Sequence, residues 1–402
     1  MIKDLFQIQN YKLFLTNMTM LGMAVAITAP FLVIFMTETH GMSSTSYGIF
    51  MAAAAVGSFF VNTIVGRYSD KLKFDRKYLI IAALLMQIMA FLSFLIIPNT
   101  WILIISYIIF FSLGAPAMPQ LYASARESIN QYRSSIAVMA NTILRSMFSF
   151  GFLFGPLVGS ILLARYDFTG LFFGTVIMFA VVFMSSFLIK NSSAPAVASD
   201  TIELTNYEEP KSPNLLTSGT LFIPFIAFVF LHVGQWMYLL NMPLFVTGYL
   251  NEADSAVGIL ASLCAGLEVP LMILMGYAAS KVSSKTLLII AGFIGSMYFL
   301  SIGIFESYTM MLIGQLPLAL FLAILLGLGI SYFQDLLPQF PGYASTLFAN
   351  AMIVGQLLGN LLGGIANDVL GVENSFYISG AFLFIAFILF FFTKKEVRKG
   401  DI

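Results

Sequence analysis

The sequence predicts an all-α membrane protein with 12 transmembrane helices arranged as two six-helix bundles. Composition, the lengths of the apolar segments and the placement of Lys and Arg predict this fold class. Of the 402 residues, 59% are hydrophobic and only 9% are charged, which is too little charge to cover a soluble domain. The 19 basic residues are scattered and balanced by 19 acidic ones, so we expect no nucleic-acid partner.

Apolar segments of the right length for a membrane recur along the chain. A helix needs about 20 apolar residues to cross roughly 30 Å of hydrocarbon at about 1.5 Å per residue. Charged and turn-forming residues divide the chain into twelve such segments, at 13–37, 46–66, 78–97, 101–123, 135–163, 171–189, 219–249, 256–280, 286–305, 308–333, 343–366 and 374–393. The first run continues to Met36, beyond the length of a secretion signal, so we expect this helix to be retained.

The Lys and Arg residues predict the orientation of the spans. If the N-terminus lies inside, every Lys and Arg falls on the inner side except Arg145, which lies within a span, and Arg165, which lies outside. Because an excess of Lys and Arg marks cytoplasmic segments, we expect both termini to be cytoplasmic.

One long polar stretch predicts the domain organisation. Residues 190–218 are rich in Ser, Pro and acidic residues and are typical of a cytoplasmic linker. This linker separates an N-terminal six-helix bundle at 1–189 from a C-terminal six-helix bundle at 219–402.

A weak repeat relates the two predicted bundles. Tyr47-Gly48-Ile49 lies 18 residues before Gly66, and Val257-Gly258-Ile259 lies 18 residues before Gly276. Parallel repeats related by an axis along the membrane normal are typical of transporters whose two halves rock against each other. The repeat therefore favours transport.

The sequence lacks the residues that most enzymes and metal sites need. Cys264 is the one cysteine, and His40 and His232 are the two histidines, too few for a disulfide or a structural zinc site. Phosphate-binding, zinc-protease and serine-hydrolase motifs are also absent from the sequence. We therefore expect no enzyme, no cofactor and no metal, and we expect His40 to be solvated in an outer loop.

Two ionisable residues lie near the middle of predicted spans. Arg145 and Glu268 each need a partner or a water-filled cavity, because a lone charge in the membrane costs at least about 2.5–3.5 kcal/mol. We interpret Glu268 as a group that binds and releases a proton, with Arg145 pairing with its charged form. The alternative is a static ion pair that holds two helices together.

Polar side chains within the spans predict a neutral cavity suited to a sugar. In the seventh span these are His232, Gln235, Trp236, Tyr238 and Asn241. Their spacing of three and four residues places several on one helix face, where they could bind hydroxyl groups and stack on a sugar ring. Candidate substrate-binding amides elsewhere are Asn17, Gln120, Asn141, Asn350 and Gln356. Hydrogen bonding between helices is the alternative for each.

The fifth span contains a cluster of small residues. Gly151, Gly155, Pro156 and Gly159 allow another helix to approach closely and add a proline bend. Close packing of small residues is enough to explain this helix-packing motif, and a role in transport is not required.

At the inner end of the second span, Gly66-Arg67-Tyr68-Ser69-Asp70-Lys71, followed by Asp75-Arg76-Lys77, resembles the signature loop of the major facilitator superfamily. The resemblance implies that Gly66, Asp70 and Arg76 belong to a conformational latch that holds the cytoplasmic side closed in the outward-facing state. The usual glycine in the middle of the motif is missing here, and its spacing is altered. The segment Gly155-Pro156-x2-Gly159 resembles the antiporter motif of the same superfamily, which is associated with efflux.

Three further blocks resemble the bacterial sugar efflux transporters of this superfamily. They are Ala117-Met118-Pro119-Gln120-Leu121, Gly266-Leu267-Glu268-Val269-Pro270 and Phe333-Gln334-Asp335-Leu336. The resemblance implies proton-driven export of small saccharides such as lactose, glucose and thiogalactosides. Arg145 and Glu268 match the residue types of that subfamily, whereas Asn241 replaces an aspartate, so Glu268 carries more of the predicted proton coupling.

These observations predict a proton-coupled secondary active transporter that exports small saccharides or glycosides across the bacterial cytoplasmic (inner) membrane by alternating access. Its predicted partners are the sugar, protons and the lipid bilayer, and it is expected to act as a monomer. A proton-coupled multidrug efflux transporter is the alternative within the superfamily, and a membrane receptor or scaffold is a third possibility. The amide-rich interior favours the sugar.

Overall fold

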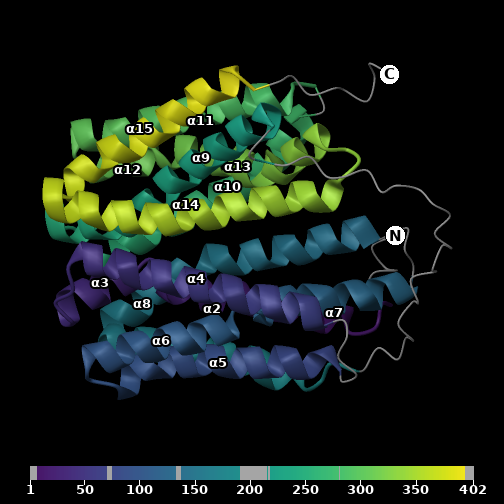
Figure 1. Ribbon diagram of the computed structural model, residues 1–402. Coiled ribbons are helices and arrows are strands. Elements are labelled where there is room, and N and C mark those ends of the chain that lie inside the picture. Colours follow the sequence, from purple (N-terminus) through teal and green to yellow (C-terminus); the bar gives the residue numbers. More distant parts are fainter. Residues whose placement is uncertain are drawn as a thin grey trace.

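The computed structural model describes residues 7–69, 75–132, 137–190, 215, 218–279 and 281–393, and within them the chain is helical with no strand (Figure 1). The α-helices are α2 (Tyr11–Thr28), α3 (Leu32–Ile34), α4 (Ser44–Ser69), α5 (Arg76–Ile96), α6 (Thr100–Gly114), α7 (Ala117–Tyr132), α8 (Ala137–Ser186), α9 (Gly219–Leu244), α10 (Asp254–Ala279), α11 (Ser284–Phe305), α12 (Tyr308–Ile313), α13 (Gln315–Leu336), α14 (Pro341–Leu370) and α15 (Val372–Phe391). Short π-helices, η1 (Phe35–Thr39) and η3 (Phe245–Tyr249), end the first and seventh predicted spans.

Eleven helices in the described part of the chain are long and apolar enough to cross a membrane, against the twelve predicted. The difference arises in α8, because the predicted spans 135–163 and 171–189 both fall within it. The apolar part of α8 has 44 residues, which corresponds to about 66 Å, or roughly two membrane thicknesses. Tyr166 and Asp167 break its helical conformation, and Asp167 has a positive φ of 53°. The other ten predicted spans each match one candidate helix.

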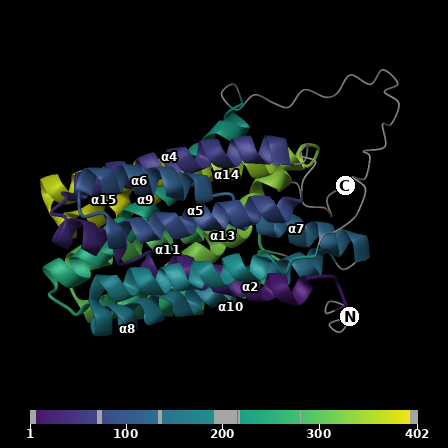
Figure 2. The same ribbon diagram turned by 90° about the horizontal axis from the view of Figure 1, so that it is seen from below.

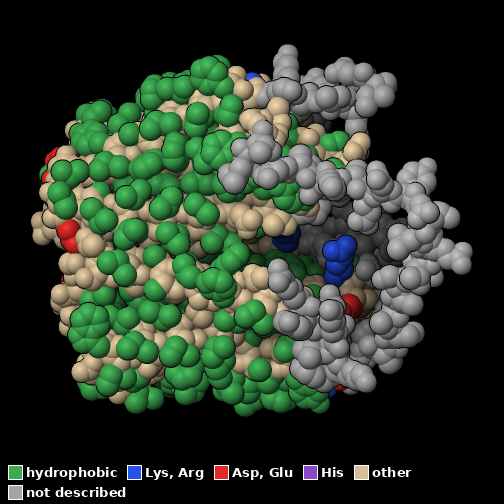
Figure 3. All heavy atoms as spheres, viewed as in Figure 1, with side chains coloured by type: hydrophobic (Ala, Val, Ile, Leu, Met, Phe, Trp, Pro, Cys, Tyr) green, Lys and Arg blue, Asp and Glu red, His purple; other side chains and the backbone are tan. Residues whose placement is uncertain are grey.

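The helices form two groups on either side of the predicted linker, most of which lies outside the described residues. In Figure 1 the helices α2 to α8 occupy the lower part of the molecule, and α9 to α15 occupy the upper part. Helix α2 packs along α8 within the first group, and α9 packs on α14 and α15 within the second. Most of the face seen in Figure 3 is apolar, as expected of a surface in contact with lipid.

The predicted helix-packing motif brings α8 against α2. A Cβ atom added at Gly151 would lie 1.9 Å from the Thr19 carbonyl oxygen, and one at Gly155 would lie 2.3 Å from the Ala26 Cβ. Gly159 likewise faces α2, whereas the carbonyl of Pro156 faces Gly258 of α10. The glycines thus allow close packing within the first group, and Pro156 belongs to the contact between the two groups.

The two groups of helices meet mainly along two contacts, which together we call the seam, and α3 also touches α9. Helix α4 packs on α14, and α8 packs on α10, and these pairs lie side by side in Figure 2. We call the end of the molecule where α2 begins and α15 ends the termini end, and the opposite end, where α4 begins, the seam end.

The seam is tight near the seam end. A Cβ atom added at Gly48 would lie 2.2 Å from the Asn360 carbonyl oxygen, and one at Gly258 would lie 2.7 Å from that of Pro156. By contrast, a Cβ at Gly66 or Gly276, toward the termini end, would meet nothing within 4 Å. The first glycine in each half of the sequence repeat therefore lies against the other group of helices, and the second has room for an added Cβ.

Candidate functional site

A polar face of α9 provides the best-formed group of candidate substrate contacts. His232 is buried, and its Nδ1 lies 2.9 Å from Oε1 of Gln235. The other ring nitrogen of His232 is buried without a hydrogen-bond partner among the described residues. Gln235 and Trp236 are half-buried one turn further along. This face therefore combines an aromatic surface with a polar group that has no hydrogen-bond partner. It carries no formal charge as long as the His232 ring is neutral.

Helix α14 packs against this face and carries the candidate Gln356. Gly355 packs against His232, with an added Cβ falling 2.3 Å from the His232 Cβ, and Gly359 packs against Trp236 in the same way at 2.6 Å. Gln356 follows Gly355 on the helix, turned by about 100° from that contact, and is half-buried. We call His232, Gln235, Trp236 and Gln356 the α9–α14 cluster.

Tyr238 and Asn241, also predicted to bind substrate, point into the packed second group instead. The Tyr238 hydroxyl lies 3.4 Å from that of Tyr298. The Asn241 side chain is 0% exposed, donates to the carbonyls of Met237 and Gly363 at 3.1 Å each, and accepts from Asn367 at 2.9 Å. In this conformation both side chains hold helices together, which is the alternative that the sequence left open.

The remaining predicted amides are dispersed over the first group and α14. Oδ1 of Asn17 accepts from the Ser185 hydroxyl at 2.6 Å, and Oε1 of Gln120 accepts from Arg76 at 2.8 Å, so both amides bridge helices of the first group. Asn350 is half-buried on α14. Asn141 lies where the structure describes the helix but not its side chain. Only Gln356 among these amides joins the α9–α14 cluster.

Arg76, a member of the predicted latch, is bound within the first group. Its Nη2 lies 2.7 Å from Oε1 of Glu127, and its Nε donates to the same oxygen at 2.9 Å. Gly66 lies toward the termini end, and Asp70 lies outside the described residues. The latch prediction therefore stays a prediction.

The structure does not pair Arg145 with Glu268 in this conformation. Arg145 is exposed, Glu268 is half-buried, and no ion pair within 4.0 Å joins them among the described side chains. Their helices make contact where Leu153 lies 3.1 Å from an added Cβ at Gly266. Measured along the helix axes from that contact, Glu268 is about 3 Å away on α10 and Arg145 is about 12 Å away on α8. The two charged residues therefore lie at different levels along the contact.

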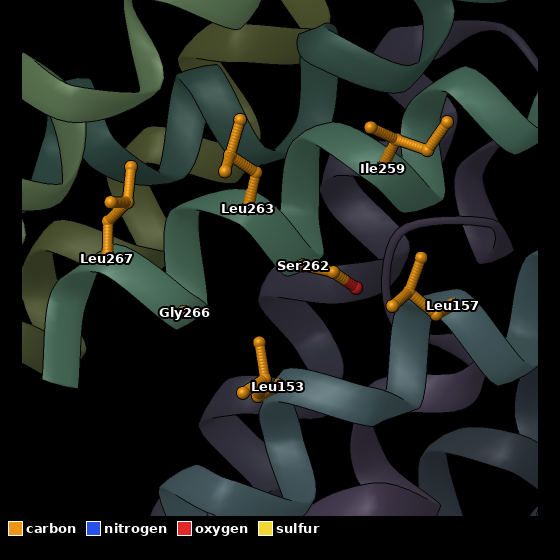
Figure 4. A pocket seen from close by; sticks show the side chains of 7 residues that line it. All are labelled: Leu153, Leu157, Ile259, Ser262, Leu263, Gly266 and Leu267. Atoms are coloured by element: carbon orange, nitrogen blue, oxygen red, sulfur yellow. The ribbon is translucent and has the colours of Figure 1, made fainter.

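An apolar pocket lies in the α8–α10 part of the seam, close to Glu268. Figure 4 shows its lining, which comprises Leu153, Leu157, Ile259, Ser262, Leu263, Gly266 and Leu267. Its volume is about 350 Å³, and the Ser262 hydroxyl is its one polar side-chain group. None of the predicted substrate-binding residues lines it, and its chemistry suits a lipophilic molecule better than a sugar.

The polar contact at the seam end was missed by the sequence analysis. Asp368 of α14 accepts hydrogen bonds from the backbone amides of Ser44 and Thr45, at the start of α4. Asp368 lies just beyond the predicted span 343–366, so it does not stand out as a charge in the middle of a span. The signal that could have found it is an acidic residue at a helix C-terminus, where its own helix dipole disfavours it.

His40 was expected to be solvated, but it is fixed between two helices. Its Nδ1 lies 2.9 Å from the Thr100 hydroxyl, and the edge of its ring meets Phe35 with the centroids 4.9 Å apart. Burial lowers the pKa of the His40 imidazole below its usual value. This loop histidine therefore helps to tie the loop before α4 to α6.

Comparison with curated proteins finds relatives that match along nearly the full length. The chain is 30% identical over 360 residues to "Sugar efflux transporter B" of Salmonella typhimurium, covering 89% of each protein. It is 29% identical over 376 residues to "Sugar efflux transporter C" of Escherichia coli, covering 93% of each.

Solved transporters share the fold at low sequence identity. A nucleoside transporter superposes with a TM-score of 0.77 at 13% identity, covering 95% of this chain and 98% of the other. A D-xylose-proton symporter superposes with a TM-score of 0.75 at 14% identity, covering 96% and 97%. These structures support the fold alone.

The family model of the Major Facilitator Superfamily matches residues 14–223 and 224–402, which divide close to the point where α9 begins. Two matched regions cover nearly the whole chain, and each holds one of the two groups of helices. The family consists of membrane transporters rather than enzymes. The chain belongs to the Major Facilitator Superfamily and is a full-length relative of its bacterial sugar efflux transporters.

Proposed function

We propose that the protein exports small saccharides or glycosides across the bacterial cytoplasmic membrane in exchange for protons. The observation that carries this proposal is the full-length similarity to two proteins named sugar efflux transporters. The α9–α14 cluster supports it, because amides and an aromatic ring without formal charge suit a neutral molecule rich in hydroxyl groups.

The proposed topology has twelve crossings, with both termini in the cytoplasm. The break at Tyr166 and Asp167 supports two crossings within α8, since its apolar part is long enough for both. On the face seen in Figure 3, the basic side chains gather toward the termini end, where acidic ones also lie, and the charged side chains visible at the seam end are acidic. This distribution supports a cytoplasmic termini end. Bundles 1–189 and 219–402 in one chain supply both sides of a pathway, so a monomer suffices.

Alternating access is the proposed transport cycle, and the close contacts at the seam end support it. With the seam end closed, we take this conformation to be the one that faces the cytoplasm, from which the α9–α14 cluster is proposed to bind its substrate. Rocking the two groups about the seam opens the opposite side, as in other transporters built from repeats. A saccharide bound from the cytoplasm is then released outside.

Glu268 is the proposed site of proton exchange. It lies two residues from Gly266, at the contact between α8 and α10, so a change in the seam alters the surroundings of its carboxyl group. Arg145 lies toward the same end of α8, and movement of the two helices along each other could bring the charges together. A nearby guanidinium favours the charged carboxylate, whereas a desolvated site favours the protonated form.

A flux assay tests this proposal. Proteoliposomes loaded with lactose and given an imposed pH gradient should show saccharide flux with the wild-type protein. Glu268→Gln should abolish the flux driven by the gradient and preserve exchange of saccharide between the two sides, because the substituted side chain cannot release a proton. The matched control is Glu252→Gln, which removes an exposed carboxylate just before the same helix. Unchanged gradient-driven flux in Glu268→Gln would show that Glu268 does not couple transport to protons.

A multidrug exporter is the second candidate function. The apolar pocket between α8 and α10 favours it, since a cavity of about 350 Å³ with a single hydroxyl suits lipophilic compounds. Such a protein would bind lipophilic cations and have no affinity for saccharides.

A further inference from the structure

The first helical residues of α4 need hydrogen-bond acceptors from outside their own helix. In any α-helix the first backbone N–H groups have no partner within the helix. In α4 the regular pattern begins when the Tyr47 amide donates to the Ser43 carbonyl at 3.0 Å. The amides of Ser44, Thr45 and Ser46 are left, and each has to be satisfied in another way.

Two of these three amides take their acceptor from the other group of helices. The amide of Ser44 donates to Oδ1 of Asp368 at 3.0 Å, and that of Thr45 donates to Oδ2 at 2.8 Å. The third amide, of Ser46, donates to the neighbouring Ser43 hydroxyl at 3.2 Å. The carboxylate of α14 is therefore an N-terminal cap of α4, supplied from 324 residues away in the sequence.

Helix geometry makes this placement of Asp368 informative. An acidic residue is stabilised at a helix N-terminus and destabilised in the last turn, because the peptide dipoles point one way. Asp368 lies in the last turn of α14, which ends at Leu370, so its own helix disfavours the charge. The start of α4 provides the favourable environment, which exists only while the two groups are in contact.

The backbones beneath this cap touch each other. A Cβ atom added at Gly364 would lie 2.2 Å from the Ser44 carbonyl oxygen, and one at Gly48 would lie 2.2 Å from that of Asn360. The two glycines bring the helices to the distance at which the Asp368 carboxylate meets both amides. Separating the helices at this end breaks both hydrogen bonds together.

We propose that Asp368 is a positioning residue of the transport cycle, whose carboxylate holds the seam end closed by capping α4 from the opposite group of helices. This inference rests on the proposed alternating access. Opening to the outside requires water to replace the carboxylate at the Ser44 and Thr45 amides.

The cap predicts a graded response to substitution. Asp368→Asn keeps one acceptor oxygen but removes the negative charge, and Asp368→Ala removes both. Hydrogen bonds that involve a charged group are roughly twice as strong as neutral ones, so the seam end should open more often in Asp368→Asn and most often in Asp368→Ala.

Cysteine labelling measures this opening without any transported substrate. In a Cys264→Ser background, Gln356→Cys places the single thiol one turn below Asn360, on the termini side of the closed contact. A membrane-impermeant charged maleimide is added to sealed vesicles from the seam-end side. Labelling should become at least about fivefold faster in Asp368→Ala, with an intermediate rate in Asp368→Asn. Labelling from the termini side should slow correspondingly.

Two controls make the experiment decisive. Glu373→Gln removes a carboxylate that lies near the cap but is hydrogen-bonded to Asn374 of its own group, and it should leave the labelling rate unchanged. Gly364→Val forces the helices apart at the same contact and should speed labelling, which shows that the thiol reports opening. Faster labelling in Gly364→Val together with wild-type rates in both Asp368 variants overturns the proposal. If Asp368→Ala does not fold, Asp368→Asn alone decides the outcome. Loss of saccharide flux or proton coupling in other assays would not alter this readout.

Discussion

Amide side chains within the membrane serve different purposes on neighbouring helices. Asn241 is fully buried, and all of its polar atoms have partners in α9 and α14. Gln356 is half-buried on α14 and follows Gly355, the glycine that packs against His232. Residue type is therefore a poor guide to function here. The side of the helix on which an amide side chain lies distinguishes a structural amide from a candidate ligand-binding one.

Trp236 should carry much of the saccharide affinity. Stacking of an aromatic ring is worth about 0.5–1.5 kcal/mol beyond area burial, so Trp236→Ala should weaken saccharide binding by about 3- to 10-fold or more. Binding of lactose measured by calorimetry checks this. The chain provides a matched control in Trp101, which is 75% exposed at the start of α6, and Trp101→Ala should bind normally. Equal affinities for both variants would place the sugar elsewhere.

The sequence predicts which side chains are unusual in a membrane, but not what they touch. Arg145 and Glu268 stand out as charges within apolar segments, yet their offset along α8 and α10 depends on where these helices cross. Asn17 meets Ser185, 168 residues later in the chain. Such contacts depend on tertiary packing, which the local pattern of the sequence does not contain.

At the scale of elements, apolar length predicted nearly every helix. Ten of the twelve predicted spans match separate helices, and the other two share α8. The loop expected around Arg165 shrinks to a break at Tyr166 and Asp167. Charged residues indicate where the chain leaves the membrane. They do not indicate how many residues the connection between two helices needs, so the length of this loop was not predicted.

The contact between α2 and α8 should be sensitive to a single methyl group. Gly155→Ala places a Cβ 2.3 Å from that of Ala26, so we expect a loss of stability of about 1–3 kcal/mol from overpacking. Thermal unfolding in detergent measures the effect. Gly276→Ala is the matched control, because its added Cβ meets nothing within 4 Å and should leave the melting temperature unchanged. Similar melting temperatures for the two variants would mean that α2 and α8 separate easily.

At the scale of the whole molecule, the repeat in the sequence corresponds to the two ends of the seam. Gly48 and Gly258 lie against the opposite group of helices, whereas an added Cβ at Gly66 or Gly276, 18 residues further on, would meet nothing within 4 Å. Eighteen helical residues span about 27 Å, close to the thickness of the hydrocarbon layer. The sequence thus predicts the equivalence of the two groups. It could not predict which end is closed, since the same residues serve both states.

Ligand class can be decided on the whole protein. A ligand that binds only the folded protein raises its apparent stability by RT ln(1 + [L]/Kd), which is about 2.7 kcal/mol at a hundredfold excess over Kd. We expect lactose or a thiogalactoside to raise the melting temperature, and we expect a lipophilic cation to have no effect. The opposite result would favour the multidrug alternative and direct attention to the pocket between α8 and α10.

The cap on α4 also has a consequence for biosynthesis. Asp368 is translated 324 residues after Ser44, and a ribosome adding about 5–20 residues per second needs roughly 15 to 65 seconds to reach it. Until then, the amides at the start of α4 have no carboxylate from α14 and need water as their acceptor. The hydroxyl-rich run from Ser43 to Ser46 suits contact with water, because it remains hydrated until the last helices arrive. A nascent chain interrupted before α14 would thus insert its first bundle and never close it.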